Sequence, residues 1–418
     1  MSWATVPLGK IISLKYGKAL PARDRDETGQ YPVAGSNGAQ GAHSHFLVDG
    51  PGIVVGRKGS AGKVVWYGQP FWPIDTTYFV EPKIKLDMRY VFYLLTHLQL
   101  DRLKTVTGVP GLNREDVYRE EVPLPPPSEQ QRIVEILDQT DALRRKRTEA
   151  DEKAQRILPA LFVKMFGDAE RHWSEAPISK LVEQRKGAIR TGPFGSHLRH
   201  SEFVEQGIPV LGIDNVVTNR FRWAKPRALP PEKYRQFKRF RVFPEDVPIT
   251  IMGTTGRVCV APSDLPECMS TKHLCVLTFD RQKVEPVYVW AALLFDPFVR
   301  AQVKSSGHGA IMEGWNTTIV KNLNLRVPSP DLQREFVKRA RAVLSHETNS
   351  EVSADNLKNV YEAVTHRAFS GDLTAKWRES RTDELLRETE EQARMIEEAN
   401  MKGAGRTGHG RPRRTASC

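Results

Sequence analysis

Residues 127–137 read PSEQQRIVEIL, and residues 330–340 read PDLQREFVKRA. The two stretches align without gaps when the sequence is shifted by 203 residues, so that Gln130 falls on Gln333. The same shift aligns further positions on both sides: Gly111 with Gly314, Asn113 with Asn316, Pro125 with Pro328 and Phe166 with Phe369. A repeat at one fixed spacing indicates that one structural unit occurs twice in the chain.

The segments before these stretches also match, at other spacings because the intervening loops differ in length. Residues 32–35 match residues 209–212, and residues 59–64 match residues 253–258. The predicted order is therefore globular unit, helix, globular unit, helix, tail. The expected boundaries are a first domain at 1–126, a first helix at 127–168, a second domain at 169–327, a second helix at 328–372, and a charged helix with a basic glycine-rich tail at 373–418.

The two helical stretches have the pattern of an interrupted coiled coil. Apolar residues recur at steps of three and four through 128–166 and, less regularly, through 331–368. Each stretch has about 40 residues and would be about 60 Å long at about 1.5 Å per residue. Antiparallel packing of the two apolar stripes covers both of them, and it places the two globular units at opposite ends.

The ends of the first helix and its one proline need separate predictions. Ser128 with Gln131 fits a capping box, and Asp331 is expected to cap the second helix. Pro159 lies inside the first stretch, where it removes a hydrogen bond and clashes with the preceding turn. We therefore expect a kink near residues 155–159, or an earlier end to the helix.

Each globular unit is expected to be α+β. Short β-rich runs such as 52–56 and 247–251 alternate with glycine turns and with helical stretches at 88–103 and 287–303. The predicted fold class is therefore α+β, with two repeated α/β domains separated by two long antiparallel helices. These helices pack as a coiled coil, and the arrangement has pseudo-twofold symmetry.

The chain is basic, with 62 Lys and Arg against 50 Asp and Glu and a net charge of +12. Residues 169–326 alone hold 23 basic and 15 acidic side chains. This concentration is typical of a surface that faces a polyanion, although a basic surface kept for solubility accounts for it equally well. No apolar run approaches the roughly 18–20 residues of a membrane span, and the N-terminus lacks signal-peptide features. We therefore expect a soluble cytoplasmic protein.

Motifs of catalysis are incomplete. Residues 59–63 resemble a phosphate-binding Walker loop, but Arg57 stands where its first glycine belongs, and Val64 replaces the Mg²⁺-binding Ser or Thr. Residues 296–298 (DPF) resemble a motif of adenine methyltransferases, but they lack its second proline and follow no glycine-rich cofactor turn. These departures predict that the chain has no catalytic residues.

The four cysteines form no C-x-x-C pair, and in a cytoplasmic chain they are expected to be reduced. Cys268, His273 and Cys275 allow a zinc site, but a fourth ligand is missing and the spacing is irregular. No metal site is therefore predicted.

Short motifs recur in a fixed order along the chain: Trp3 with PLG at 7–9, GRKGSAG at 56–62, PSEQQRI at 127–133, TGPFGS at 191–196 and AFSGDLT at 368–374. In this combination, which covers about residues 1–378, the chain resembles the DNA-specificity subunit of type I restriction–modification systems. Single motifs are loose, whereas all of them in this order are specific.

The resemblance implies two target-recognition domains that each read one half of a split double-stranded DNA site, and two spacer helices that set the gap. It implies a chain that is not itself an enzyme. Two methylation subunits are expected to dock on the helices, and two motor–nuclease restriction subunits are expected to join them. S-adenosylmethionine, ATP and Mg²⁺ are expected on these partners, and no cofactor is expected on this chain.

Polar loop residues are the candidates for DNA contacts, because Arg, Lys, Asn, Gln, Ser and Thr read base edges. In the first domain the candidates are Ser36, Asn37, Gln40, Arg57, Lys58, Lys63 and Asn113. In the second they are Arg190, Thr191, Ser196, His197, Arg199, Asn215, Thr254, Thr255, Arg257 and Lys272. Each is as readily explained as a solvated loop or turn residue, as with Asn37 followed by a glycine.

Two further segments are open to two interpretations each. The run 233–241 interleaves aromatic and basic residues, as in proteins that stack on single-stranded bases. Because Tyr234, Phe237 and Phe240 recur every three residues, we favour a core-facing helix edge. Residues 379–401 predict a charged helix, and the basic residues after it form either a DNA-facing arm or a solvated tail without a role.

Two rival functions belong to other classes. One is a self-contained methyltransferase–nuclease, which the incomplete catalytic motifs oppose. The other is a scaffold that binds only protein. A test of DNA binding would distinguish this scaffold from a DNA-specificity subunit.

Overall fold

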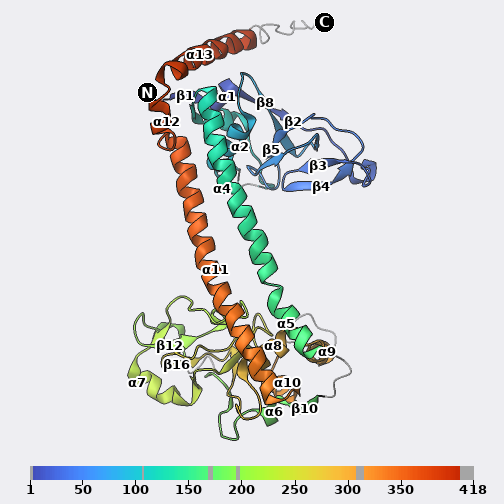
Figure 1. Cartoon of the computed structure of the whole chain (residues 1–418), viewed down its shortest axis with the longest axis vertical. Helices are drawn as coiled ribbons and strands as arrows, with labels where there is room; N and C mark the ends of the chain where they lie inside the picture. Colours follow the sequence, from blue (N-terminus) through green and yellow to red (C-terminus); the bar gives the residue numbers. More distant parts are fainter. Residues whose placement is uncertain (1–2, 106–107, 168–172, 194–197, 307–314, 405–418) are drawn as a thin grey trace, which may run out of the picture. The chain divides into compact units, whose positions relative to one another are not determined.

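The computed structural model describes residues 3–105, 108–167, 173–193, 198–306 and 315–404 (Figure 1). The chain forms two compact units. Unit 1 comprises Met1–Arg147 and Ala354–Cys418, and unit 2 comprises Thr148–Ser353. Each of the two long helices contributes one part to unit 1 and the other part to unit 2.

Unit 1 is built on two small sheets, with strand orders β2–β8–β5–β6 and β4–β3–β7, and on the antiparallel pair β1–β9. Its strands are β1 (Ala4–Pro7), β2 (Ile12–Tyr16), β3 (Tyr31–Gly35), β4 (Gly38–His43), β5 (Gly52–Gly56), β6 (Val64–Tyr67), β7 (Trp72–Pro73), β8 (Thr77–Pro82) and β9 (Glu121–Leu124). Its helices before the long ones are α1 (Leu8–Ile11), α2 (Met88–His97) and α3 (Arg114–Tyr118).

Unit 2 has two sheets, with strand orders β11–β17–β15 and β13–β12–β16–β14, and the antiparallel pair β10–β18. Its strands are β10 (Ser174–Pro177), β11 (Ile189–Thr191), β12 (Ile208–Leu211), β13 (Ala228–Leu229), β14 (Arg241–Val242), β15 (Val247–Thr250), β16 (Cys268–Ser270), β17 (Leu274–Leu277) and β18 (Asn324–Val327). Its shorter helices are α6 (Ile178–Leu181), α7 (Pro231–Tyr234), α8 (Pro286–Phe295), α9 (Pro297–Ser306) and α10 (Thr317–Asn322). Both units are thus mixed α+β, as the sequence predicts.

Two predicted helices are shorter than expected. The stretch 88–103 is helical only to His97, because Gln99 adopts a left-handed backbone conformation (φ 48°), and a 3₁₀ turn follows at Leu100–Leu103. The stretch 287–303 contains two helices, α8 and α9, with Asp296 between them in an extended conformation. In both cases the periodic spacing of apolar residues continues across a residue that interrupts the helical backbone hydrogen bonds.

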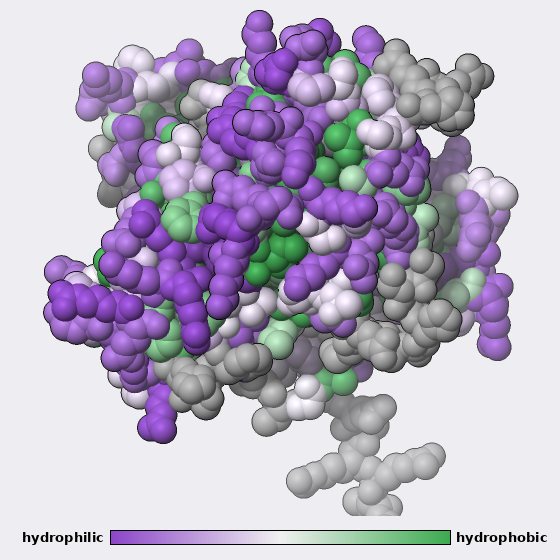
Figure 2. All heavy atoms as spheres, turned by 90° about the horizontal axis from the view of Figure 1, so that it is seen from below, coloured by the Kyte–Doolittle hydropathy of each residue, from purple (hydrophilic) through white to green (hydrophobic). Residues whose placement is uncertain are grey.

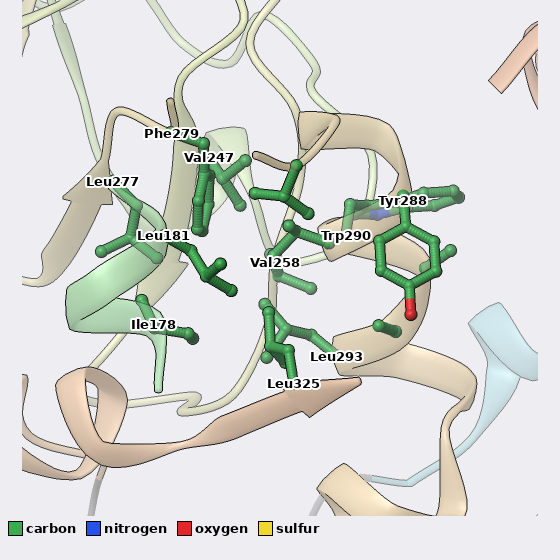
Figure 3. Packing of buried hydrophobic residues seen from close by; sticks show 14 of the residues in the cluster. Ile178, Leu181, Val247, Val258, Leu277, Phe279, Tyr288, Trp290, Leu293 and Leu325 are labelled. Carbon is green, nitrogen blue, oxygen red and sulfur yellow. The ribbon is translucent and has the colours of Figure 1, made fainter. Parts of the chain in front are cut away.

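The core of unit 2 gathers side chains from helices and strands that are far apart in sequence (Figure 3). Ile178 of α6, Leu277 of β17, Leu325 of β18 and Leu293 of α8 belong to one cluster, and all four are buried. Helix α8 supplies much of this core because it is apolar all round. Unit 1 has its own core, in which α2 packs on the sheet that contains β5.

The same buried framework occurs in both units. Gln130 donates to the proline carbonyl five residues upstream (2.9 Å) and accepts from the backbone N–H of Asp87 (2.9 Å), at the start of α2. Gln333 makes the two equivalent bonds, at 2.8 Å and at 2.9 Å to the N–H of Glu285, at the start of α8. Because the two glutamines are 203 residues apart, the structure repeats what the sequence alignment predicts.

The first long helical segment is interrupted where the sequence predicts an irregularity. Helix α4 (Pro127–Ala154) ends before α5 (Ile157–Phe166) begins. Pro159 is the third residue of α5, a position whose N–H has no intrahelical acceptor in any helix. The break therefore relieves the cost of the proline, and the expectation of an earlier end near 155–159 is confirmed.

The predicted caps of both long helices are wrong. Helix α4 begins at Pro127 and α11 (Pro330–Ser370) begins at Pro330, one residue before Ser128 and Asp331. Proline suits the first helical position because its fixed φ is already helical and its missing N–H is not needed there. The Ser128 hydroxyl instead donates to Glu388 Oε2 (2.9 Å) in α13 (Thr382–Ala404).

The two long helices pack together, with contacts in each unit. In unit 1 the guanidinium of Arg144 lies 5.0 Å over the ring of Tyr361. In unit 2 the hydroxyl of Ser350 donates to Asp151 (3.0 Å), and the rings of Phe162 and Phe336 meet edge-on at 5.8 Å. In unit 2, higher numbers in the first helical segment meet lower numbers in α11, which defines an antiparallel pairing there.

A buried polar network closes unit 1. The carboxylate of Glu129 at the start of α4 is fully buried and accepts from Trp3 Nε1 (2.8 Å) and Thr374 Oγ1 (2.6 Å). It also accepts from Nε (2.9 Å) of Arg378 in α12 (Ala375–Glu379), whose guanidinium lies over the Trp3 ring. The N-terminal segment, α4 and the C-terminal helices are thereby held together.

Within the described ranges, none of the helices combines the length and the hydropathy that a bilayer crossing requires. On the face seen in Figure 2, hydrophilic side chains cover most of the area and hydrophobic ones form small separate patches.

Candidate nucleic-acid interface

The loop after β5 in unit 1 holds three of the predicted contact residues in a fixed conformation. Its backbone closes through Gly62 N–H donating to Gly56 O (2.9 Å) and Gly56 N–H donating to Lys63 O (2.8 Å). Gly62 has φ 86°, and a Cβ there would lie 2.3 Å from the backbone nitrogen of Asp101. Only glycine suits that position. The loop therefore presents Lys58 and Lys63, which are both exposed, on a rigid base.

The equivalent loop after β15 in unit 2 has the same hydrogen bonds. Gly256 N–H donates to Thr250 O (2.9 Å), and Thr250 N–H donates to Arg257 O (2.8 Å). Gly256 has φ 75°, close to the value of Gly62. The predicted match of 59–64 with 253–258 is thus a match of three-dimensional structure. This loop exposes Thr254 and Arg257 and half-buries Thr255.

Arg57 is oriented by its neighbours in unit 1. Its guanidinium donates to the Asp75 carbonyl through Nε (3.0 Å) and Nη2 (2.7 Å) and lies 5.3 Å over the ring of Tyr16. Arg114 lies 5.4 Å over the same ring. Tyr16 is 52% exposed and was not among the predicted residues. The basic and aromatic sequence Lys15–Tyr16–Gly17–Lys18 was a signal that could have found it.

The other predicted residues of unit 1 differ in how accessible they are. Lys63 Nζ donates to the Asn37 side-chain oxygen (2.7 Å), so these two exposed residues form one polar group. Gln40 is exposed, and its side chain lies against Gly35. Ser36 is buried and donates to a backbone carbonyl (2.7 Å). Asn113 caps α3 by accepting the N–H of Glu115 (3.1 Å), a role that occupies its side-chain oxygen.

Burial of Tyr78, beside this cluster, raises its phenol pKa to about 12. Nearby Tyr16 adds to the rise, whereas the positive charges of Arg57 and Arg114 oppose it. The phenol is therefore neutral at physiological pH, and the cluster keeps its net positive charge.

In unit 2, Lys272 lies in a second group of cations. It lines a pocket of about 500 Å³ together with His273 and Arg227, neither of which was among the predicted DNA contacts. Burial lowers the pKa of His273, and the positive charges of Lys272 and Arg227 lower it further. The N–H of Ile251 donates to the His273 carbonyl (2.9 Å), which joins this group to the loop that carries Thr254.

Two predicted contact residues of unit 2 lie inside the fold. Arg190 is only 8% exposed, and its guanidinium pairs with the buried Asp246 and donates to Thr278 Oγ1 (2.9 Å). Asn215 is buried, accepts the N–H of Gly212 (2.8 Å) and donates to the carbonyl of Arg222 (2.9 Å). Both side chains make hydrogen bonds inside unit 2 that hold its structure together.

Thr191 and Arg199 line a different pocket of about 690 Å³, together with Lys233 and Arg239. The predicted residues Ser196 and His197 lie outside the described residues. The interleaved run 233–241 forms a short α-helix and a 3₁₀ turn in which Tyr234 and Phe237 are buried and Phe240 packs against them. The favoured reading of that run as a core-facing edge is confirmed.

The cysteines lie in apolar surroundings. Burial raises the thiol pKa of Cys268 and of Cys275 to about 12, so both thiols are neutral at physiological pH. Among the residues that the structure describes, no cluster of three or more His, Cys, Asp or Glu side chains could hold a metal ion.

Comparison with known proteins gives one consistent result. A family model described as "Type I restriction modification DNA specificity domain" matches residues 1–154. The chain is 20% identical over 370 residues to the type I restriction enzyme EcoBI specificity subunit of Escherichia coli, covering 79% of this chain and 75% of that protein. It is 22% identical over 374 residues to the MjaVIII specificity subunit of Methanocaldococcus jannaschii, covering 82% of this chain and 86% of that protein.

Solved structures share the fold. The crystal structure of the type I restriction–modification S subunit from M. genitalium superposes with a TM-score of 0.61 at 15% sequence identity, covering 88% of this chain and 96% of that one. A chain from a study of complex assembly and conformational transition of the type I system superposes with a TM-score of 0.50, also at 15% identity, covering 89% and 98%.

Proposed function

Because the chain belongs to the family of type I restriction–modification DNA specificity subunits, we propose that its two units read the two halves of a split site in double-stranded DNA. Members of this family are not catalytic, so the chemistry belongs to partner subunits. In this proposal residues 1–126 and 169–327 are the recognition domains. The two long helices set the gap between the half-sites.

The observation that carries the proposal is the repetition of one rigid loop in both units. The loops close with the same backbone hydrogen bonds, while their side chains differ: Lys63 in unit 1 stands where Arg257 stands in unit 2. Two loops with the same backbone conformation and different side chains suit two domains that bind the same DNA duplex at different base sequences. A single-site binder has no use for the second copy.

The charge of these loops favours DNA over a protein partner. Lys58 and Lys63 are exposed in unit 1, and Arg257 with Lys272 flanks the equivalent region of unit 2. Cations at such a surface contact DNA phosphates and fix the position of the protein along the duplex. Neighbouring Asn and Thr side chains can then form hydrogen bonds to base edges. Binding should therefore weaken steeply with added salt.

The length of the paired helices limits the distance between the two half-sites. Helix α11 has 41 residues without interruption, which corresponds to about 60 Å. At about 3.4 Å per base pair, that length is an upper bound of roughly 17–18 base pairs for the distance between half-sites. Antiparallel pairing along both helices stiffens them, as a fixed gap requires.

The helices also offer repeated positions for a partner. Ile157 of α5 and Val360 of α11 are 203 residues apart, and both are about half exposed. Apolar side chains at equivalent places on the two helices suit two copies of one partner, which we assign to two methylation subunits. Two restriction subunits with motor and nuclease activity complete the complex, and S-adenosylmethionine, ATP and Mg²⁺ are bound by these partners.

Selection from random DNA tests the proposal. The full chain, purified together with its methylation subunit, is incubated with a pool of random duplexes, and the bound DNA is sequenced. The expected result is a motif of two constant blocks separated by a constant number of unspecified base pairs. A single contiguous block, or no enrichment, would overturn the proposal.

Variants in one unit serve as matched controls for the other. Thr254→Ala with Thr255→Ala is expected to relax one block and leave the other intact. Asn37→Ala is expected to do the reverse. A change in both blocks from either variant would contradict the assignment of one block to each unit.

A further inference from the structure

The segment 216–227 of unit 2 is a cationic loop with an exposed tryptophan. It contains Arg220, Arg222, Lys225 and Arg227, and no acidic residue occurs between Asp214 and Glu232. Trp223, in the middle of these cations, is 55% exposed. Large aromatic side chains usually bury most of their surface, so a tryptophan held in solvent is a candidate for binding.

Hydrogen bonds anchor the backbone on both sides of Trp223, on the C-terminal side through the N–H of Val210, which donates to the Arg227 carbonyl (2.8 Å). The N–H of Arg222 donates to the Asn215 carbonyl (3.1 Å), and the Asn215 side chain donates back to the Arg222 carbonyl (2.9 Å). The carbonyl of Asn219 accepts from the indole N–H of Trp290 (3.0 Å) in the core. These bonds hold the loop in one conformation, so the exposed ring is already in place before any ligand arrives.

The ring itself has one aromatic neighbour. Phe221 meets Trp223 nearly perpendicularly, with ring centroids 5.1 Å apart, and Phe221 packs against the core cluster that contains Leu211. This contact supports the indole from beneath the loop while leaving more than half of its surface in solvent. The indole is therefore connected to the core through Phe221.

The surrounding charges indicate what the ring binds. Arg227 pairs with Asp214 and lines the pocket that also contains Lys272, so the tryptophan loop adjoins the candidate DNA-contact group of unit 2. A ligand for an exposed indole among cations needs an aromatic face and negative charge, and nucleotides have both. A protein partner would need acidic residues around an apolar anchor, whereas DNA provides both features along its whole length.

We infer that Trp223 stacks on a base of the bound DNA at a step where the base stack is opened, which rests on the DNA-reading function proposed for unit 2. In intact duplex DNA the base faces are covered by their neighbours, so stacking requires a kinked or unstacked step. Trp223 thus makes unit 2 sensitive to how easily its half-site deforms, in addition to the base edges that it reads. Arg220 and Arg227 are paired with Glu347 and Asp214, so the exposed Lys225 is the cation that holds a phosphate beside the opened step.

Fluorescence of 2-aminopurine tests this inference. The full chain with its methylation subunit is bound to duplexes that carry 2-aminopurine at successive positions of the half-site read by unit 2. We expect one position at which the fluorescence changes on binding with the natural chain and with Trp223→Phe, but not with Trp223→Ala. Affinity should fall by about 5- to 150-fold in Trp223→Ala, the range measured for losing one base–aromatic stack.

Lys225→Gln is the matched control two residues away. It should weaken binding to all duplexes and reduce the slope of log affinity against log salt by about one, while the 2-aminopurine signal remains. Trp223→Ala should leave that slope unchanged. Both side chains are exposed, so unchanged thermal unfolding of the two variants shows that neither effect arises from misfolding.

The possible outcomes separate this inference from the proposed function. If the natural chain selects a split motif and Trp223→Ala binds it with unchanged affinity and signal, the stacking role is overturned alone. If Trp223→Ala loses its methylation partner and keeps its DNA affinity, the tryptophan belongs to a protein interface and the inference fails. If the natural chain binds no DNA, both fail. If it binds DNA without a split motif but Trp223→Ala still binds weakly and loses the signal, only the proposed function fails.

Discussion

Removing the carboxylate of Glu129 should release the C-terminal segment of unit 1. Glu129 is fully buried and accepts hydrogen bonds from Trp3 near the N-terminus and from Thr374 and Arg378 in the C-terminal segment. Breaking a buried ion pair by removing one partner costs about 3–5 kcal/mol, because the other charge stays buried without compensation. In a unit of about 200 residues this corresponds to a fall of about 6–20 °C in the unfolding midpoint.

Glu135 in the same helix is the matched control. It pairs with Arg132 at 2.8 Å, but its side chain is 59% exposed, and such surface pairs contribute about 0–1 kcal/mol. Glu135→Ala should therefore lower the midpoint by at most about 4 °C. Scanning calorimetry compares the two variants, and hydrogen exchange of residues 374–399 reports whether the C-terminal helices have opened.

A compensating pair makes the test stricter. The equivalent position in unit 2 is Leu332, so an apolar residue is compatible with the start of a long helix in this fold. Glu129→Leu combined with Arg378→Leu should recover part of the loss, because replacing both partners of a buried pair leaves no stranded charge. If Glu129→Ala shifts the midpoint as little as Glu135→Ala, or if exchange in 374–399 is unchanged, the network does not hold the segment.

Three shorter predictions follow from other parts of the structure. Arg190→Met should destabilise unit 2 by about 3–5 kcal/mol in thermal unfolding, because the carboxylate of Asp246 stays buried without its partner. Weaker DNA binding at unchanged stability would show instead that Arg190 contacts DNA. Tyr16→Leu should weaken DNA binding in filter assays while Tyr16→Phe does not, since the ring orients Arg57 and Arg114; equal binding by both would remove Tyr16 from the site. Burial lowers the pKa of the His97 side chain, and the nearby His366 lowers it further. Below about pH 6.5 the unfolded chain therefore binds a proton that the folded chain does not bind, so the free energy of unfolding falls as the pH drops. His97→Phe should reduce this acid loss between pH 7.5 and 5.5, and an identical loss would count against it.

The repeated architecture was accessible from the sequence because it rests on local pattern. Gln130 and Gln333 occur at the same place in two similar stretches, and the structure gives them the same bonds. Pro159 predicted the break between α4 and α5, since its effect depends only on the helix that contains it. The caps failed because a proline at the first helical position competes with the serine or aspartate after it.

The contact residues were less accessible, because their exposure depends on distant partners. Arg190 looked like a loop cation, but Asp246, 56 residues later, draws it into the core. The side chain of Asn215 likewise forms hydrogen bonds to the backbone of Gly212 and of Arg222, which keeps it inside the fold. Trp223 was overlooked for the opposite reason, since its sequence context suggests a core aromatic and only the structure leaves it in solvent.

Lengthening both helices tests the central claim, that the helix pair sets the gap between two half-sites. Four residues of helix-forming sequence are inserted after Arg147 in α4 and after Ser353 in α11, where each helix passes from one unit to the other. Four residues add about one turn and about 6 Å, or between one and two base pairs. DNA selection with this variant should return the same two blocks with a gap that is one or two base pairs wider. An unchanged gap, or altered blocks, would contradict the account.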